Sequence, residues 1–171
     1  MIPKSFKLVL VIISFIYSIY QFMESYIGNG IFCLLLSGIF ILLYFKNEFI
    51  FMAFLRLRKQ DFQGTLKWLN RISNPKKNLV KKQQGYFYYL HGIISSQTNL
   101  TEAEKHFKKA IQYGLSMSTD LAMAKMSLAG ILMQKRRKRE AVNLLSEAKK
   151  LDKHGMLNQQ IKMLQQQLKK I

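Results

Sequence analysis

The near-absence of charge over the first 48 residues is the feature that most limits how this 171-residue chain can fold. Residues 1–48 contain three of the chain's 27 Lys and Arg residues and two of its nine acidic residues. The remainder therefore holds 24 basic and seven acidic side chains, which is +17 of the total net charge of +18. An apolar end followed by a strongly basic remainder predicts two parts that occupy two different solvents.

Two apolar runs predict that residues 1–48 form a transmembrane helical hairpin. The first run, residues 6–23, has Lys7 as its single charge, and the second, residues 28–45, has none. Eighteen helical residues rise roughly 27 Å, close to the ~30 Å hydrocarbon thickness of a bilayer. The core of the second run is residues 31–45, and the short turn before it, residues 24–30, contains Asn29-Gly30, which favours two antiparallel helices.

The distribution of Lys and Arg predicts the orientation of this hairpin. Lys4 and Lys7 lie at the start of the first run, and the link carries Glu24 but no Lys or Arg. The second run is followed by Lys46, Arg56, Arg58 and Lys59. The positive-inside rule then places both termini in the cytoplasm, and we expect a bacterial inner-membrane protein. A cleaved signal peptide is the alternative for the first run. That run exceeds the usual length of about 7–15 residues, however, and no small-residue cleavage site follows it.

From residue 49 onward, amphipathic helices repeat with a constant period. Thr65, Ala103 and Ala141 are each 38 residues apart. Each is followed four residues later by a bulky residue and three residues after that by a small or apolar one. These followers are Leu69 and Ile72, Phe107 and Ala110, and Leu145 and Ala148. A constant period of this length predicts a stacked array of helical hairpins.

This pattern resembles the tetratricopeptide repeat (TPR) family. The third repeat matches best, through Leu128-Ala129, Leu132, Ala141, Leu145 and Ala148, and Pro75 matches the proline that closes a repeat. The resemblance implies an all-α fold in which residues 49–171 form a cytosolic α-solenoid of about three helix pairs. Residues 156–171 are then the capping helix that such an array needs at its open end.

Two candidate partner-binding features lie on the first helices of repeats. Met123, Met126 and Met133 share one helical face with Gly130. The TPR resemblance implies that this face lines a peptide-binding groove, for which methionine is well suited. The alternative is that this face packs against a neighbouring helix. In the second repeat, residues 86–89 are four consecutive aromatics that point in all directions around a helix. We expect two of them to be buried against the first repeat and Tyr86 and Tyr89 to contribute to partner contact.

A run of five cations is the third candidate. Lys135, Arg136, Arg137, Lys138 and Arg139 fall at the turn between the two helices of the third repeat. They form a candidate anionic-surface site, because cations near a bilayer gain about 1 kcal/mol each from anionic lipid. A solvated turn is the alternative. Nucleic acid is the least favoured ligand, because no aromatic residue is interleaved with these cations.

No catalytic, metal or cofactor motif is found in the sequence. His91, His106 and His154 lack metal-ligand spacing, and no phosphate loop, nucleophile elbow or paired-carboxylate motif is present. We therefore predict a non-enzymatic protein without a cofactor: a membrane-tethered scaffold that binds a peptide segment or a subunit of a membrane complex. A protein that binds or organises the lipid surface is the first alternative, and a nucleic-acid tether is the second.

Overall fold

The chain folds entirely into helices over the part that the structure describes. The computed structural model describes the backbone of residues 4–45 and 48–170 and the side chains of residues 8–41 and 48–169. Lys4, Lys7 and Lys46, which are three of the cations behind the predicted orientation, therefore lie outside the described side chains. Ten helices and no strand are found in the described ranges, which confirms the predicted all-α class. The chain divides into two compact units, Met1–Phe51 and Met52–Ile171, which we describe separately.

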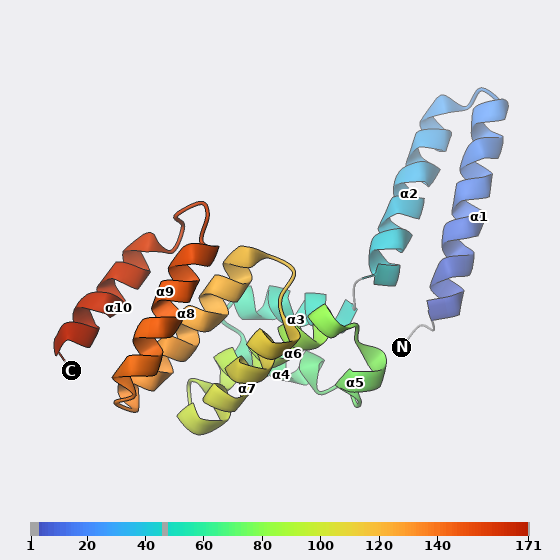
Figure 1. The fold of residues 1–171 in the computed structure, drawn as a ribbon. Helices are drawn as coiled ribbons and strands as arrows, with labels where there is room; N and C mark the ends of the chain where they lie inside the picture. The colour runs from blue at the N-terminus through green and yellow to red at the C-terminus, as the bar shows by residue number, and fades with distance from the viewer. Residues whose placement is uncertain (1–3, 46–47, 171) are drawn as a thin grey trace. The chain divides into compact units, whose positions relative to one another are not determined.

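The first unit is a helical hairpin of α1 (Lys4–Met23) and α2 (Ile27–Phe45), which pack side by side (Figure 1). The turn between them is shorter than predicted, because Asn29-Gly30 lies in the first turn of α2. Ser25 closes the turn with a φ of 63°. Within the stretches that the structure describes, we found no helix with the length and apolarity needed to cross a bilayer. The spans expected at residues 6–23 and 28–45 thus gain no support from this criterion.

The second unit is an array of helix pairs of the α-solenoid type, shown in Figure 1. Its helices are α3 (Glu48–Arg58), α4 (Phe62–Leu69), α5 (Pro75–Asn78), α6 (Lys81–Ser95), α7 (Leu100–Tyr113), α8 (Ser118–Gln134), α9 (Lys138–Leu151) and α10 (Asn158–Lys170). The α3 helix begins in the first unit and continues into the second. Successive helices pair, α6 with α7 and α8 with α9, and α7 also packs against α8. Side chains of α6 to α10 share one continuous core.

The repeated sequence positions are buried in all three repeats. The nine positions that define the 38-residue period are Thr65, Leu69, Ile72, Ala103, Phe107, Ala110, Ala141, Leu145 and Ala148, and none is more than 4% exposed. Gly92 lets α6 approach α7 closely, because a Cβ atom there would lie 3.0 Å from the ring of Phe107. Small residues at helix contacts and bulky residues between them therefore build this array, as the period predicted.

The first repeat is less regular than its sequence suggested. Its second helix, α4, already ends at Leu69, and a separate short helix, α5, begins at Pro75, the proline that was predicted to close this repeat. Proline disfavours a helical conformation in the residue before it and is well accommodated at the first position of a new helix. Asn74 accepts a hydrogen bond from the backbone N–H of Lys77 at 3.3 Å and so caps α5.

The last helix covers the open end of the array. The α10 helix packs against α9 and α8. Ile161 and Leu168 are 1% and 3% exposed, and Leu164, on the same face, is half-buried. Before α10, the carboxylate of Asp152 accepts hydrogen bonds from the backbone N–H groups of Met156 and Leu157, at 3.1 and 2.7 Å. This buried cap fixes the chain between α9 and α10.

Candidate protein-interaction surface

The methionine stripe of α8 is divided between the surface and the core. Met123 and Met126 are half-buried and pack against the edge of the core, so part of each side chain remains accessible. Met133, in contrast, is only 5% exposed and belongs to the core itself. Gly130 leaves open space between them, since no atom lies within 4 Å of a Cβ built there. The accessible part of the stripe is therefore its N-terminal half.

The aromatic run of α6 is divided in a similar way. Tyr89 is 5% exposed and packs its ring against Phe107, with the centroids 6.0 Å apart, so it has a core position rather than a surface one. Tyr86 is half-buried and donates a hydrogen bond of 2.5 Å from its hydroxyl to Asp120 at the start of α8. Burial, together with this hydrogen bond, raises the pKa of Tyr86 to about 12. Tyr86 thus joins two successive first helices of the array.

A stack of aromatic rings along α6 and α7 was not predicted from the sequence. The rings of His91 and His106 stack with centroids 5.3 Å apart, and Tyr88 stacks on Tyr113 at 5.5 Å. Burial, with a smaller contribution from His106, lowers the pKa of His91 to about 4. The pKa of His106 is also lowered, mainly by burial. Both rings are therefore neutral at pH 7 and serve as packing groups between the two helices.

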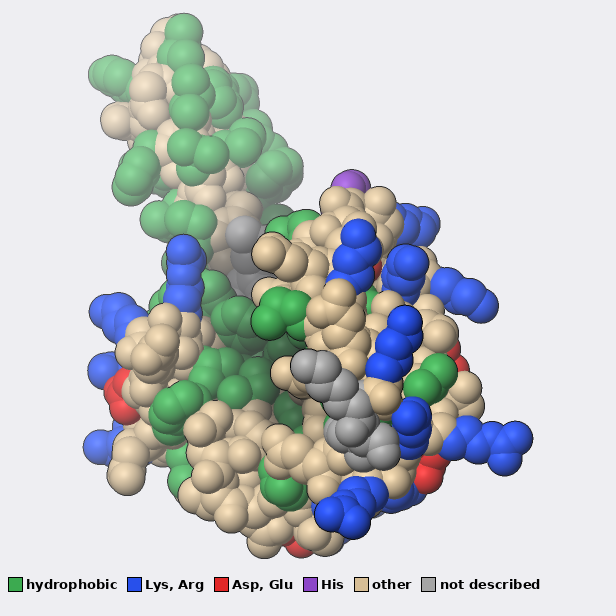
Figure 2. Space-filling model, turned by 90° about the vertical axis from the view of Figure 1, so that its left-hand side faces the viewer, with side chains coloured by type: hydrophobic (Ala, Val, Ile, Leu, Met, Phe, Trp, Pro, Cys, Tyr) green, Lys and Arg blue, Asp and Glu red, His purple; other side chains and the backbone are tan. Residues whose placement is uncertain are grey.

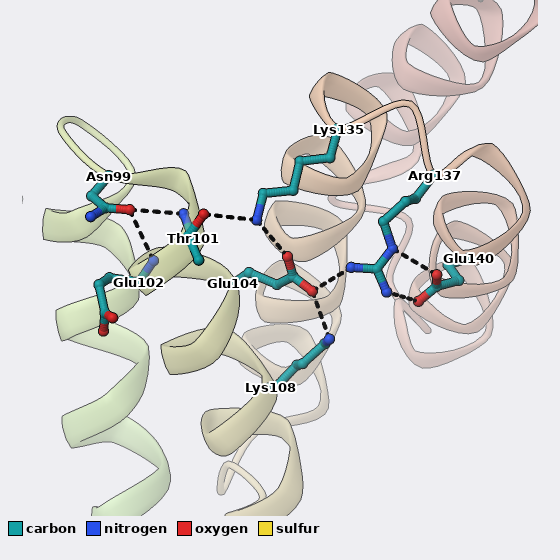
Figure 3. A network of polar contacts seen from close by, with 8 residues as sticks. All are labelled: Asn99, Thr101, Glu102, Glu104, Lys108, Lys135, Arg137 and Glu140. Carbon is teal, nitrogen blue, oxygen red and sulfur yellow. Dashed lines mark hydrogen bonds and ion pairs between the residues drawn. The ribbon is translucent and has the colours of Figure 1, made fainter.

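The run of five cations is divided by one buried carboxylate on α7, Glu104, shown in Figure 3. Lys108, one turn further along α7, approaches a Glu104 oxygen at 2.6 Å. Lys135 and Arg137 reach the same carboxylate from the turn between α8 and α9, at 2.8 and 2.6 Å. Arg137 also forms a two-pronged ion pair with Glu140, with its Nε 2.8 Å and its second terminal nitrogen 2.6 Å from the carboxylate oxygens.

These contacts give Glu104 a structural role between the second and third repeats. The hydrogen bonds from Lys108 and Lys135 are the largest influences that lower the pKa of Glu104 to about 2, so it remains ionised at any physiological pH. Lys135 and Arg137 are committed to this network and are poorly placed to bind an external anion. The other three cations, Arg136, Lys138 and Arg139, are exposed. The candidate anionic-surface site thus reduces to these three side chains.

The open grooves on the repeat array include two that are lined by more than one helix. One, of about 450 Å³, runs between α9 and α10 and is lined by Lys138, Val142, Lys162, Gln165, Gln166, Leu168 and Lys169. The other, of about 340 Å³, lies over α7, α8 and α9 and is lined by Lys108, Ile111, Leu128, Leu132, Glu140, Asn143 and Leu144. Among the described residues, no group of three or more His, Cys, Asp or Glu side chains is arranged to hold a metal ion.

The chain was compared with protein-family models, with curated proteins and with solved structures, and no match was found. Its resemblance to TPR proteins therefore stays a prediction that depends on the repeat pattern.

Proposed function

We propose that this protein is a membrane-tethered scaffold in which a lipid-embedded hairpin carries a TPR-like array that binds a segment of a partner protein. The tether and the binding face are supported by different observations, and each has its own test. Confinement to a membrane raises the effective concentration of a binding module for partners in the same membrane, so a shallow groove of modest affinity is sufficient.

The inverted packing of the hairpin is the observation that carries the proposal. The positions buried within residues 8–41 are all small or polar: Ser18, Gln21, Gly30 and Ser37. The large apolar side chains point outward instead, and Ile16, Phe32 and Leu35 are 61%, 64% and 60% exposed. A water-soluble helix pair would bury these apolar groups, whereas helices in lipid meet through small and polar residues.

Close contact at the hairpin seam fits the same interpretation. The hydroxyl of Ser18 donates a 2.7 Å hydrogen bond to the carbonyl oxygen of Gly30 on the facing helix. A Cβ at Gly30 would lie 2.9 Å from the ring of Phe22, so the absence of a side chain there permits the approach. Interhelical hydrogen bonds and small residues are the features that hold helices together in a bilayer. The excess of Lys and Arg outside residues 8–45 favours the cytoplasmic side of a bacterial inner membrane for the array.

The accessible methionines of α8 form the proposed binding face. Figure 2 shows one face of the molecule, on which hydrophobic side chains gather in a hollow with Lys and Arg side chains on either side. Met123 and Met126 are the predicted contact residues that remain accessible, with Tyr86, which is hydrogen-bonded to Asp120 at the start of the same helix. Met133 and Tyr89 are not part of this proposal, because their side chains are in the core. An apolar surface edged by cations suits an amphipathic segment that carries acidic residues.

Site-specific photo-cross-linking tests this face. We expect a photoreactive phenylalanine analogue at Met126 to capture a discrete partner in native membranes, and Met126→Asp to abolish that adduct when the probe is at Met123. Met163, which is 55% exposed on α10, provides a matched control position for the probe. The same adducts from Met126 and Met163, or adducts that persist in Met126→Asp, would refute the binding face.

A second candidate function, binding to an anionic lipid surface, is favoured by the three exposed cations Arg136, Lys138 and Arg139. The full-length protein in neutral nanodiscs should then capture phosphatidylserine vesicles in a salt-sensitive manner. Replacement of the three cations by Gln should remove this capture, and unchanged capture would exclude the site.

A further inference from the structure

The α3 helix has apolar side chains on both of its faces. On one face, Ile50 and Ala53 are buried, at 9% and 0% exposed. The other side chains of its central turns are large, apolar and open to the surroundings. Phe51 is 58% exposed, Met52 41%, Phe54 39% and Leu55 41%. A surface helix in water normally has one apolar face and one polar face, so the exposed apolar side of α3 needs a further cover.

The C-terminal end of α3 indicates what kind of surface could contact its exposed apolar side chains. Arg56 and Arg58 lie in the last turn of α3, and Lys59 follows directly. Arg56 forms an exposed 3.2 Å ion pair with Asp61, whereas Arg58 and Lys59 are exposed and extend the basic end. Whatever contacts the exposed side of α3 must therefore accommodate bulky apolar side chains along the middle of the helix and cations at its C-terminal end. The boundary region of an anionic lipid bilayer offers both, because apolar acyl chains lie directly beneath negatively charged headgroups.

Covalent connectivity favours the bilayer over a partner protein. The α2 helix ends at Phe45 and α3 begins at Glu48, three residues later. Three residues span at most about 11 Å, so α3 must begin close to the end of the hairpin. If the hairpin is in lipid, as the proposed function states, the start of α3 is held near the lipid–water boundary.

We infer that α3 is an interfacial helix, which lies on the cytoplasmic surface of the bilayer with Phe51, Met52, Phe54 and Leu55 in the acyl boundary and its basic end among anionic headgroups. This inference rests on the proposed membrane tether. It also predicts that the repeat array is held at the membrane surface by α3 and is not joined to the hairpin by a flexible linker.

Depth-dependent quenching of a single tryptophan tests the inference. Trp68 is the only tryptophan, so Trp68→Phe provides a background without one. Phe54→Trp in this background should emit at short wavelength in phosphatidylserine-containing vesicles and lose most of its emission when the lipids carry bromine near the headgroup end of the acyl chains. Met163→Trp, at an exposed site on α10, should emit at long wavelength and keep its intensity.

Vesicle flotation of the same variants separates failure of the tether from failure of the inference. If the Phe54→Trp variant floats but its emission is not quenched, the interfacial placement is overturned and the tether remains intact. A short emission wavelength without bromine quenching would assign the cover to a second copy of the chain, and would overturn the inference as well. A protein that does not float would refute both. Leu55→Trp provides a second probe if Phe54→Trp fails to fold, with the same outcomes expected.

Discussion

At the scale of single residues, one buried acid determines how a strongly basic chain uses its cations. Glu104 gathers Lys108, Lys135 and Arg137 within hydrogen-bonding distance and so joins the α8–α9 turn to α7. The chain has 27 basic residues and nine acidic ones, so each buried acidic side chain shows which cations are engaged in ion pairs. The sequence pattern identified the run of five cations at residues 135–139, but the contacts of Glu104 determine which of these cations remain available to bind another molecule.

Removal of the Glu104 charge should reduce the stability of the folded chain. We expect Glu104→Gln to lower the free energy of unfolding by about 2–3 kcal/mol, because Lys135 and Arg137 lose their shared partner. Glu147→Gln is the matched control, since Glu147 pairs with Lys125 but is largely exposed, and it should cost about 1 kcal/mol or less. Thermal unfolding followed by circular dichroism measures both. Equal losses in the two variants would contradict the role assigned to Glu104.

The buried histidine of α6 predicts a dependence of stability on pH. The pKa of His91 is lowered from 6.5 to about 4 in the folded chain, so the unfolded chain binds a proton more readily between these values. The contribution of neutral His91 is complete above pH 6.5 and is lost as the pH falls towards 4, by about 2–3 kcal/mol.

The His91→Phe variant keeps a ring against Phe87 and has no proton to bind, so its stability should change less over this pH range than that of the unmodified chain. His154→Phe, at an exposed position, is the control and should leave the pH dependence unchanged. Chemical denaturation at pH 7, 6, 5 and 4, values that cover the interval between the two pKa values, makes the comparison. An identical pH dependence in all three proteins would exclude His91 as the cause.

At the scale of helices, close approach of α6 and α7 depends on Gly92. Alanine has the higher helix propensity, yet its Cβ would meet the buried ring of Phe107 at 3.0 Å. We expect Gly92→Ala to destabilise the chain by about 1–2 kcal/mol. Gly130→Ala, on α8, meets no atom within 4 Å and should be neutral or stabilising by up to about 1 kcal/mol. A stabilised Gly92→Ala variant would show that the two helices do not pack as described.

The helix scale also shows what the sequence can predict. The 38-residue period identified nine buried positions, eight of them on the second helices and Ile72 just after α4, because the same face of each helix meets the same kind of neighbour. It did not predict that α4 ends at Leu69, because that end depends on local capping, in which the backbone N–H of Asn70 bonds to the carbonyl groups of Leu66 and Trp68. Met133 and Tyr89 were predicted to contact a partner but are buried. Periodicity identifies the apolar face of a helix, but it cannot tell whether a neighbouring helix or a partner covers it.

At the scale of the whole molecule, the two units follow opposite packing rules. The repeat array buries apolar residues such as Leu90, Leu132 and Leu145, each at most 1% exposed. The hairpin buries Ser18 and Ser37, which are 1% and 2% exposed, and presents its large apolar side chains to the outside. The difference in charge between the two parts was clear from the sequence. The inversion of the packing became clear only once the helices were placed beside one another.

Extraction of membranes with alkaline carbonate distinguishes a hairpin embedded in lipid from one that is only attached to the membrane surface. Membranes from cells that make the full chain are washed at high pH, and the pellet and supernatant are probed for the protein. We expect the protein to stay in the pellet, because the apolar surface of α1 and α2 remains in the bilayer after charge-dependent contacts are broken. Release of the protein into the supernatant would show that the hairpin is not in lipid, and the proposed tether would be wrong.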